Sequence, residues 1–285
     1  MKKNPSFERF NNKYNRVDQD RAPIPFTARL MAYYRAQEFE LKDALIIDPY
    51  AKSLAGDLTE YFKDHGRYSK MDYSIVRSYY IEENLLKLWC YERNRSQVVL
   101  LGAGLDTRAY RFTPLSKNLH TLFEIDLPEL MEYKKEILKG EKSLCELIRI
   151  SENLSNLNWI DKLFHYGYSK DIPTFWVLEG VMYYLEKNEA SLVLKKISEI
   201  SSKKSRIFTD LCVPVYAEVR LGPFSKHFKW GIEKEKITNY FKKSGWKVSV
   251  DWADNHDQGR DVGQKGLFFI SGEVLKYSNI KTLKP

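Results

Sequence analysis

An alternation of short apolar segments with amphipathic ones, across residues 97–213, constrains the fold of this chain more than any other feature. Each apolar segment has the length and composition of a buried strand. The five segments are QVVLLG (97–102), HTLFEID (120–126), CELIRI (145–150), TFWVLEG (174–180) and SRIFTDLCV (205–213). Helical patterns lie between them, including PELMEYKKEIL (128–138), LNWIDKLF (157–164) and EKNEASLVLKKISEIS (186–201). Short apolar strands that alternate with helices predict an α/β fold, in which helices cover both faces of a parallel sheet.

The flanking segments extend this fold on both sides. Residues 26–64 form helical pieces interrupted at Asp48-Pro49, and residues 69–93 carry apolar side chains at the spacing of one amphipathic helix. After an irregular stretch at 213–231, a helix is expected to end near Gly245. The strand patterns WKVSVDWA (246–253) and GLFFISGEVL (266–275) are joined by a polar loop, which predicts an antiparallel pair. Residues 1–25 are polar and end in the turn-prone RAPIP, so we expect an N-terminal arm followed by one domain over 26–285.

The basic charge of the chain does not indicate a nucleic-acid-binding protein. The chain has 285 residues and a net charge of +8, which suits one large domain. Its lysines are dispersed and interleaved with glutamates, as in EKEK at 233–236, and this mixing is typical of solvated helix faces. We find no recognition helix, zinc finger or RNA-binding sheet pattern, so no nucleic-acid partner is expected.

The cysteines and the hydropathy pattern favour a cytoplasmic protein. Three cysteines lie far apart in the chain, which argues against a disulfide framework and against a cysteine-based metal site. The N-terminal segment lacks the apolar stretch of a signal peptide. No apolar run approaches the roughly 20 residues that a membrane span needs. We therefore expect a cytoplasmic location, with no membrane partner and no metal.

A glycine pair, Gly102 and Gly104, ends the first predicted strand in the sequence LLGAGLDTR. Glycine at this place allows a tight turn and a close approach of a ligand to the backbone. The pattern alone is weak evidence, because many such turns only pack a helix on a sheet. Thr107 stands where a dinucleotide-binding fingerprint prefers a third glycine, which disfavours a pyrophosphate ligand. The sequence also lacks the GK[ST] of a P-loop.

Two carboxylates, Asp126 and Glu179, end later strands at the same edge of the predicted sheet. Asp126 follows the glycine pair by about twenty residues, the place from which an acid binds both hydroxyls of a ribose. The alternative is that Asp126 caps the helix that starts at Pro128. Glu179 and Gly180 end the fourth strand, and a carboxylate at an apolar strand end is costly unless it is solvated or paired. This placement indicates a ligand site, with a structural ion pair as the alternative.

These segments together resemble the leucine carboxyl methyltransferase family, which includes bacterial polyketide O-methyltransferases of the tetracenomycin type. The resemblance rests on VVLLGAGLDTRAYRF (98–112), FEIDLP (123–128), PTFWVLEGVMYYL (173–185) and FTD (208–210), and it spans about residues 26–211. It implies a class I methyltransferase fold, Rossmann-like, with a seven-stranded sheet whose last strand is antiparallel. It also implies S-adenosyl-L-methionine as the cofactor. We expect residues 26–95 to form a helical cap and residues 213–231 a lid insertion.

The resemblance also implies roles for individual residues. Arg77, in DYSIVRSYY (72–80), matches the arginine that grips the methionine carboxylate, for which a planar guanidinium is suited. The alternative is a surface arginine of that helix. The segments that hold the rest of the cofactor correspond to Gly102, Ala103, Gly104, Asp126, Leu127, Asn153, Leu154, Glu179 and Gly180.

One position departs from the family pattern. The family usually has Asp-Leu after the third strand, where the acid contacts the adenine amino group, and this chain has Asn153-Leu154. The asparagine carbonyl oxygen can still accept a hydrogen bond, but the charge is lost. We therefore expect weaker binding of the adenine.

The expected function is O-methylation of a small-molecule carboxylate or hydroxyl, such as a polyketide or related secondary metabolite. A carboxylate acceptor needs no base, whereas a hydroxyl benefits from one. The sequence contains no clear base, which favours a carboxylate or an acidic enol or phenol. Candidate catalytic residues are Glu179, Tyr183 and His227, and candidate acceptor contacts are Tyr33, Tyr216, Arg220 and His227.

Other functions remain open at this point. One is a protein methyltransferase that acts on a C-terminal leucine carboxylate, and another is a cofactor-binding module without catalysis. A nicotinamide-dependent dehydrogenase is disfavoured by the missing third glycine. The acceptor's identity and the oligomeric state do not follow from the sequence.

Overall fold

The computed structural model describes residues 23–66, 70–219, 222–263 and 266–275. Most of the expected N-terminal arm lies outside these ranges. Helix α2 (Pro23–Phe39) begins inside the last part of the expected arm, with proline in its first turn. Proline is tolerated there because the first N–H groups of a helix have no partner within it. The first helix of the described chain therefore begins within the turn-prone RAPIP.

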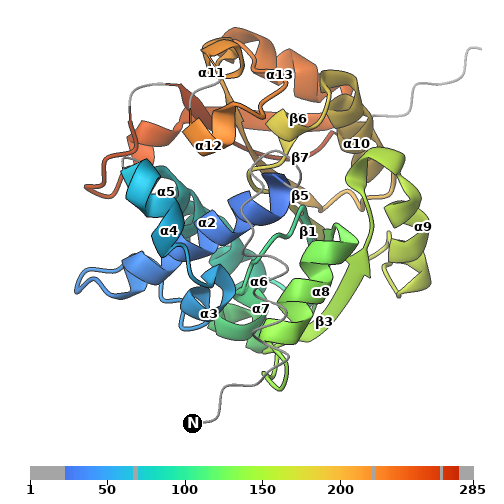
Figure 1. Ribbon diagram of the computed structural model, residues 1–285. Helices are drawn as coiled ribbons and strands as arrows, with labels where there is room; N and C mark the ends of the chain where they lie inside the picture. Colours follow the sequence, from blue (N-terminus) through green and yellow to red (C-terminus); the bar gives the residue numbers. More distant parts are fainter. Residues whose placement is uncertain (1–22, 67–69, 220–221, 264–265, 276–285) are drawn as a thin grey trace, which may run out of the picture.

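The fold is built on one seven-stranded sheet with the order β3-β2-β1-β4-β5-β7-β6 (Figure 1). Strands β1 to β5 pair in parallel, and β7 pairs antiparallel with both β5 and β6. The predicted parallel sheet and its antiparallel last strand are thus confirmed. The strands are β1 (Arg95–Leu101), β2 (Leu119–Asp126), β3 (Glu146–Ser151), β4 (Thr174–Leu178), β5 (Arg206–Cys212), β6 (Trp246–Trp252) and β7 (Leu267–Val274).

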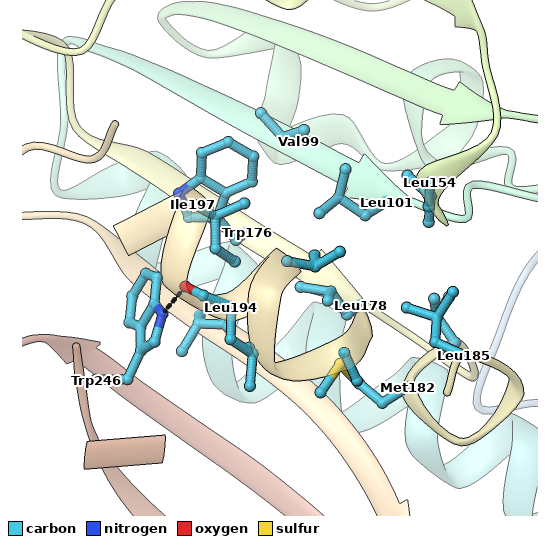
Figure 2. Packing of buried hydrophobic residues seen from close by; sticks show 14 of the residues in the cluster. Val99, Leu101, Leu154, Trp176, Leu178, Met182, Leu185, Leu194, Ile197 and Trp246 are labelled. Carbon is cyan, nitrogen blue, oxygen red and sulfur yellow. Dashed lines mark hydrogen bonds between the residues drawn. The ribbon is translucent and has the colours of Figure 1, made fainter. Parts of the chain in front are cut away.

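Helices cover both faces of the sheet because successive strand residues point to opposite sides. Val99 and Leu101 of β1 pack under α9 (Asn158–His165), α10 (Lys187–Glu199) and α13 (Lys234–Lys243). Figure 2 shows this packing, including Trp246, whose indole N–H donates to the Leu194 carbonyl over 2.8 Å. Val98 and Leu100 face the other side, under α6 (Lys87–Tyr91), α7 (Arg108–Arg111) and α8 (Pro128–Ile137). Burying one such side chain contributes roughly 1.5–3 kcal/mol.

The helix predicted over residues 69–93 is continuous from Asp72 to Tyr91, but it is not regular. It consists of α5 (Asp72–Tyr79), a π-helical segment η2 (Tyr80–Leu86) and α6. A π segment has wider turns than an α-helix and often marks a functional site. Here two consecutive side chains, Ile81 and Glu82, are both buried. The carboxylate of Glu82 thereby enters the polar interior, which an ideal amphipathic pattern would not predict.

Shorter elements complete the chain. The helical pieces expected over 26–64 are α2, α3 (Ala51–Ala55) and α4 (Thr59–His65). The stretch expected to be irregular contains two short helices, α11 (Pro214–Val219) and α12 (Gly222–Ser225). Short 3-10 helices are η3 (Thr113–Ser116), η4 (Leu154–Asn156), η5 (Met182–Tyr184) and η6 (Ala253–His256). Among the described residues, none of the helices has the length and apolar character needed to cross a membrane.

Candidate active site

A cavity of about 850 Å³ lies at the carboxyl ends of the parallel strands. This edge is where ligands bind in open α/β sheets. The cavity has the size of a small-molecule site, for which roughly 300–1,000 Å³ is usual. It brings together nearly all the residues singled out in the sequence: Arg77, Gly102, Ala103, Gly104, Asp126, Leu127, Asn153, Leu154, Glu179, Gly180, Tyr183, Tyr216 and His227.

The glycine turn after β1 has a backbone that only glycine adopts easily. Gly102 has φ +73° and Gly104 has φ +52°, both in the left-handed region. A Cβ on Gly102 would lie 2.4 Å from Cγ2 of Val181, so that position is also too crowded for a side chain. A Cβ on Gly104 would meet only Ala28, at 3.9 Å. The left-handed backbone favours glycine at both positions, and at Gly102 the contact with Val181 also leaves no space for a side chain.

Asp126 holds this turn in place. Its Oδ2 accepts the Gly104 N–H at 2.7 Å, and its Oδ1 accepts the N–H of Leu127 at 2.7 Å. Burial raises the pKa of Asp126, and the two backbone hydrogen bonds oppose that shift. Helix α8 is capped at Leu127 without a side-chain cap, so Asp126 does not serve as its N-cap. Each carboxylate oxygen keeps a second lone pair, so the group can still accept hydroxyl donors from the cavity.

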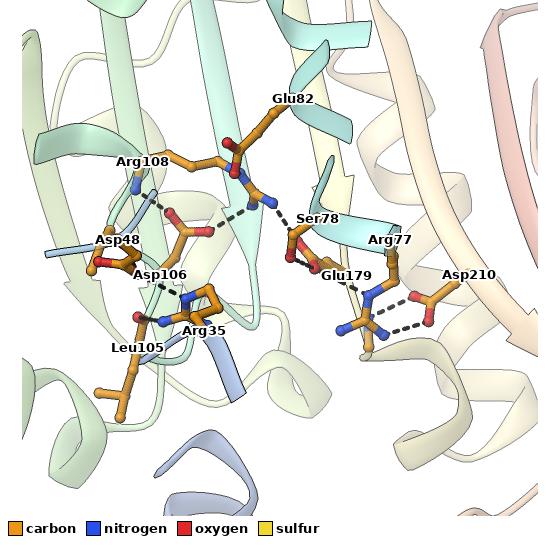
Figure 3. Close-up of polar contacts among 12 residues, drawn as sticks. Arg35, Asp48, Arg77, Ser78, Glu82, Leu105, Asp106, Arg108, Glu179 and Asp210 are labelled. Carbon is orange, nitrogen blue, oxygen red and sulfur yellow. Dashed lines mark hydrogen bonds and ion pairs between the residues drawn. The ribbon is translucent and has the colours of Figure 1, made fainter. Parts of the chain in front are cut away.

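Arg77 is a buried arginine and not a surface one. Its Nε donates to Oε1 of Glu179 at 3.1 Å, and its Nη1 donates to Oδ2 of Asp210 at 2.7 Å (Figure 3). Its Nη2 makes no hydrogen bond with the residues that the structure describes, and it faces the Gly180 turn, where a Cβ would lie 3.3 Å away. The guanidinium is thus fixed on two sides and keeps donors for a ligand in the cavity.

Asp210 is a site residue that we did not assign from the sequence. It is fully buried at the end of β5. Besides Arg77, its Oδ2 accepts the hydroxyls of Tyr73 at 2.8 Å and Tyr183 at 3.2 Å, and its Oδ1 accepts the Gly180 N–H at 2.6 Å. The sequence did contain a signal, because FTD lies in the second half of the fifth strand, toward the edge that carries Asp126 and Glu179.

Glu179 is ionised and paired on both oxygens. Oε1 accepts from Arg77 and from the hydroxyl of Ser78 at 2.8 Å, and Oε2 pairs with Arg108 at 2.9 Å. Burial by itself would raise the pKa of Glu179, but the guanidinium groups of Arg108 and Arg77 outweigh it and lower the pKa to about 2. A carboxylate this acidic is a poor base. Its expected catalytic role stays a prediction, and its contacts favour orienting Arg77.

Arg108, in the DTR part of the GAGLDTR segment, links Glu179 of the site to two further carboxylates. Arg108 donates to Asp106 at 2.6 Å and to Glu82 at 2.9 Å, in addition to its pair with Glu179 (Figure 3). Burial alone would lower the pKa of Arg108, but these carboxylates raise it well above its usual value. Buried charges persist only when paired in this way. The sequence indicated no role for Asp106 and Arg108 beyond the family resemblance, because Glu82 and Glu179 lie far from them in the chain.

The same network continues into the N-terminal helices. Thr107 donates to Asp48 at 2.7 Å, and Arg111 donates to Glu82 through two nitrogens, at 2.6 and 2.8 Å. Arg35 of α2 donates to the same Asp48 at 2.8 Å. The network therefore ties the helical segment over 26–95 to the glycine turn. Thr107, which replaces a fingerprint glycine, has this structural role.

The tyrosine pair after β4 is buried beside Arg77. The Tyr183 hydroxyl donates to Asp210 and accepts from Nη1 of Arg77 at 3.3 Å. Burial and the neighbouring charge of Asp210 raise the pKa of Tyr183 well above its usual value. Tyr183 therefore stays protonated at neutral pH. A raised pKa does not favour a role as a general base, and the expected catalytic role of Tyr183 stays a prediction.

Asn153 lines the cavity, but not in the orientation expected from the sequence. It is the N-cap of η4, and its Oδ1 accepts the Ser155 N–H at 2.9 Å. The carbonyl oxygen that we expected to face an adenine amino group therefore points toward the turn, where one of its two lone pairs accepts the Ser155 N–H. Asparagine favours this cap because its short side chain reaches the backbone N–H two residues ahead.

The acceptor contacts expected from the sequence divide into three groups. Tyr216 and His227 line the cavity, together with Val215, Val219, Phe224 and Phe228 of the same segment. Tyr33 does not line it, because its ring packs on Phe62 and Tyr34 and its hydroxyl accepts from Gln37 at 2.8 Å. Other residues of α2 face the cavity in its place, namely Thr27, Ala28, Met31 and Arg35, which recur at helical spacing. Arg220 lies outside the described residues.

Within the described part of the chain, no group of three or more His, Cys, Asp or Glu side chains is placed to hold a metal ion. The titratable groups of the cavity pair with one another and with arginines. The arrangement is suited to binding a polar, charged ligand at one end and an apolar one at the other.

Comparison with known proteins identifies the family. Residues 28–198 match the family leucine carboxyl methyltransferase. A Parafrankia protein named provisionally as an S-adenosyl-L-methionine-dependent methyltransferase is 31% identical over 233 residues, which cover 74% of this chain and 73% of that protein. A Streptomyces coelicolor protein with the same provisional name is 34% identical over 193 residues, 64% of this chain and 66% of that protein.

Solved structures agree on the fold. A protein of Thermobifida fusca, titled provisionally as a methyltransferase, has a TM-score of 0.57 at 16% identity, and the match covers 86% of this chain and 94% of that chain. A duf574 family protein of Streptomyces avermitilis has a TM-score of 0.58 at 9% identity, with 85% of this chain and 96% of that chain covered. These likenesses concern the fold alone.

The fold is therefore that of the class I methyltransferases, as the resemblance implied. The chain belongs to the leucine carboxyl methyltransferase family. The expected enzyme class, a methyltransferase, is confirmed, and the family and the relatives' names support S-adenosylmethionine as the expected cofactor.

Proposed function

We propose that this methyltransferase transfers a methyl group from S-adenosylmethionine to an oxygen of a small acceptor that is ionised at neutral pH. The observation that carries this proposal is that one cavity is lined by Asp126, the bare Gly102–Gly104 turn and Arg77. These are a hydrogen-bond acceptor for ribose hydroxyls, open backbone, and a guanidinium with free donors for a carboxylate. When bound, S-adenosylmethionine supplies an electrophilic methyl group on a sulfonium.

The residues of the cavity fit this cofactor. Asp126 accepts the ribose hydroxyls through the lone pairs left by Gly104 and Leu127. Gly104 leaves room for the ligand, because a Cβ at this position would meet only Ala28, at 3.9 Å. Arg77 binds the methionine carboxylate with Nη2, the nitrogen that Glu179, Asp210 and Tyr183 leave free. Each contact uses a group that the protein has already fixed, so little ordering is needed on binding.

The acceptor side is apolar and aromatic. The helices α11 and α12 and the segment after them contribute Val215, Tyr216, Val219, Phe224 and Phe228 to the lining. Val215 and Val219 are half exposed, at 48% and 50%, on one side of α11. Apolar side chains that are left open beside a polar cofactor site favour an acceptor with a flat apolar body. These contacts support the proposal that the segment 213–231 acts as a lid and sets acceptor specificity.

The proposal of an ionised acceptor rests on the pKa values of the nearby groups. Glu179 has a pKa of about 2 and is held by two arginines, and the pKa of Tyr183 lies far above neutrality. Asp210 is covered by four hydrogen bonds from Arg77, Tyr73, Tyr183 and Gly180. None of these groups is suited to remove a proton from an acceptor. A carboxylate, or an acidic enol or phenol, reacts without such help, and the chain then aligns the reactants and excludes water.

The experiment is a binding and transfer test on the purified protein. Calorimetry with S-adenosylmethionine should give one site per chain, and NAD should not bind appreciably. Incubation with a panel of aromatic carboxylic acids, phenols and aliphatic alcohols should give methyl transfer to the acids or acidic phenols. Tight binding of NAD without S-adenosylmethionine would contradict the cofactor, and transfer only to aliphatic alcohols, or to a peptide ending in leucine, would contradict the acceptor class.

A further inference from the structure

The order of groups along the cavity places the base of the cofactor beside β3. This step rests on the proposed function. Arg77 reaches Asp210 at the end of β5, whereas Asp126 ends β2 and Asn153 follows β3. The sheet order is β3-β2-β1-β4-β5, so these sites follow one another along its edge. S-adenosylmethionine is linear, with its carboxylate at one end, the ribose inside and the purine at the other end. The purine then lies past Asp126, among Leu127, Asn153 and Leu154.

Asn153 presents its amino group, and not its carbonyl oxygen, as the free polar group at this end. The Ser155 backbone N–H can only donate, so its 2.9 Å contact fixes which half of the side-chain amide is the oxygen. The remaining atom, Nδ2, makes no hydrogen bond with any residue in the described ranges. Asn153 is solvent-exposed and lines the cavity, so Nδ2 is accessible to a ligand.

The carboxylate of the neighbouring Glu152 already accepts from three groups. Oε1 of Glu152 accepts the Asn153 N–H at 3.0 Å and Nδ2 of Asn156 at 2.8 Å. Oε2 of Glu152 pairs with Lys162 at 2.7 Å. Among the described residues, two side-chain groups of this turn make no hydrogen bond, Nδ2 of Asn153 and the hydroxyl of Ser155, and both residues line the cavity.

We propose that Asn153 recognises the purine by donating a hydrogen bond from Nδ2, so that the site discriminates only weakly between a 6-amino and a 6-oxo purine. Adenine offers ring nitrogen N1 as an acceptor on this edge, and a 6-oxo purine offers O6. A carboxylate at position 153 would keep the turn, because either of its oxygens accepts the Ser155 N–H. Its second oxygen would then accept from a 6-amino group and repel a 6-oxo group.

The test is calorimetry with two product analogues, S-adenosylhomocysteine and S-inosylhomocysteine, which differ at the 6-position and at the protonation of N1. The parent protein should prefer the adenine analogue by less than about fivefold, or about 1 kcal/mol. Asn153→Asp should raise the preference to about tenfold or more, because it replaces the donor with an acceptor. Asparagine and aspartate are equally good N-caps, so the turn should be retained.

Asn158→Asp is a matched control. Asn158 is exposed at the start of α9, its side chain makes no hydrogen bond with the described residues, and it is not among the cavity-lining residues. This variant makes the same change of charge close by and should keep the parent's ratio. Asn153→Ser is a second test, because serine keeps a capping oxygen and removes Nδ2. It should weaken both analogues by a similar factor.

A preference of the parent for the adenine analogue above about fivefold would overturn this inference alone. A ratio that Asn153→Asp leaves unchanged, or that Asn158→Asp changes equally, would overturn it too. Binding of neither analogue by the parent would overturn the proposed function, and this inference with it.

Discussion

Nη1 of Arg77 donates to Oδ2 of Asp210 over 2.7 Å, although 133 residues separate the two in the chain. The same carboxylate accepts the Gly180 N–H and the Tyr73 hydroxyl. One buried acid therefore fixes both the direction of the guanidinium and the turn after β4. Because a guanidinium is planar, holding its Nε and Nη1 sides determines where its free nitrogen points.

Arg77→Lys should weaken binding of S-adenosylhomocysteine by about 1.5–3 kcal/mol, since an ammonium cannot keep Glu179, Asp210 and a ligand carboxylate at once. 5′-Methylthioadenosine, which lacks the amino-acid part, should bind the variant and the parent equally well. Calorimetry with both ligands measures the difference. Asp210→Asn should reproduce part of the loss for S-adenosylhomocysteine. An equal loss for both ligands would mean that Arg77 acts only by packing its helix.

Asp126→Asn should weaken the cofactor by about 1.5–3 kcal/mol, the usual size for losing hydrogen bonds to a charged group. The side chain ends a strand and the amide can still accept one of its two backbone N–H groups, so the fold should persist. Asp126→Ala should cost stability as well, about 1–3 kcal/mol, because buried N–H groups lose their partner. Urea unfolding and calorimetry separate the two effects. Normal cofactor binding by both variants would restrict Asp126 to holding the turn.

The two glycines of the β1 turn should respond differently to alanine. Gly104→Ala carries only the strain of a left-handed backbone, roughly 1–2 kcal/mol. Gly102→Ala carries that strain and a clash, because its Cβ would lie 2.4 Å from Cγ2 of Val181. Chemical denaturation should therefore show the larger loss for Gly102→Ala. Adding Val181→Ala should recover part of it, and no recovery would show that the clash is relieved elsewhere.

Protonation of Glu179 should lower the stability of the folded protein at acid pH. Its pKa is about 2 in the folded chain against an ordinary value of 4.5, so its contribution is complete above about pH 4.5 and is lost as the pH falls toward 2. The full contribution is about 3 kcal/mol by linkage. The difference in unfolding free energy between the parent and Glu179→Gln should therefore shrink from pH 6 to about pH 3. A difference that stays constant with pH would mean that Glu179 has the same pKa in the folded and the unfolded chain.

His227 separates the two kinds of acceptor. With a hydroxyl acceptor that needs a base, the rate should fall as the pH is lowered and His227 takes up a proton, and His227→Ala should remove that dependence. With a carboxylate acceptor, the rate should stay level until the acceptor is protonated near pH 4. We expect the second profile, measured on the acceptor found by screening. Cofactor affinity should be the same in the variant and the parent, because the segment lies on the acceptor side.

The sheet, its helices and the edge that carries the site all follow from the amino-acid sequence alone. The patterns that indicate them are local: strands and helices differ in the period of their apolar residues, and a glycine pair or an acid at a strand end is visible within a few residues. Parallel strands bring their carboxyl ends to one edge of a sheet. The strand pattern therefore suffices to predict that Gly102, Asp126 and Glu179 share one site, and they line the same cavity.

The partner of each charged group, in contrast, depends on the tertiary structure. Asp210 meets Arg77, and Glu82 meets Arg108 and Arg111 from a π-helical turn, across separations that no local pattern encodes. The orientation of single side chains also depends on the tertiary structure. Tyr33 lies on a side of α2 that packs on Phe62 and not on the cavity, and the Ser155 N–H fixes which way the amide of Asn153 points. A buried charge must find a partner wherever the fold supplies one, and that choice depends on the packed chain as a whole.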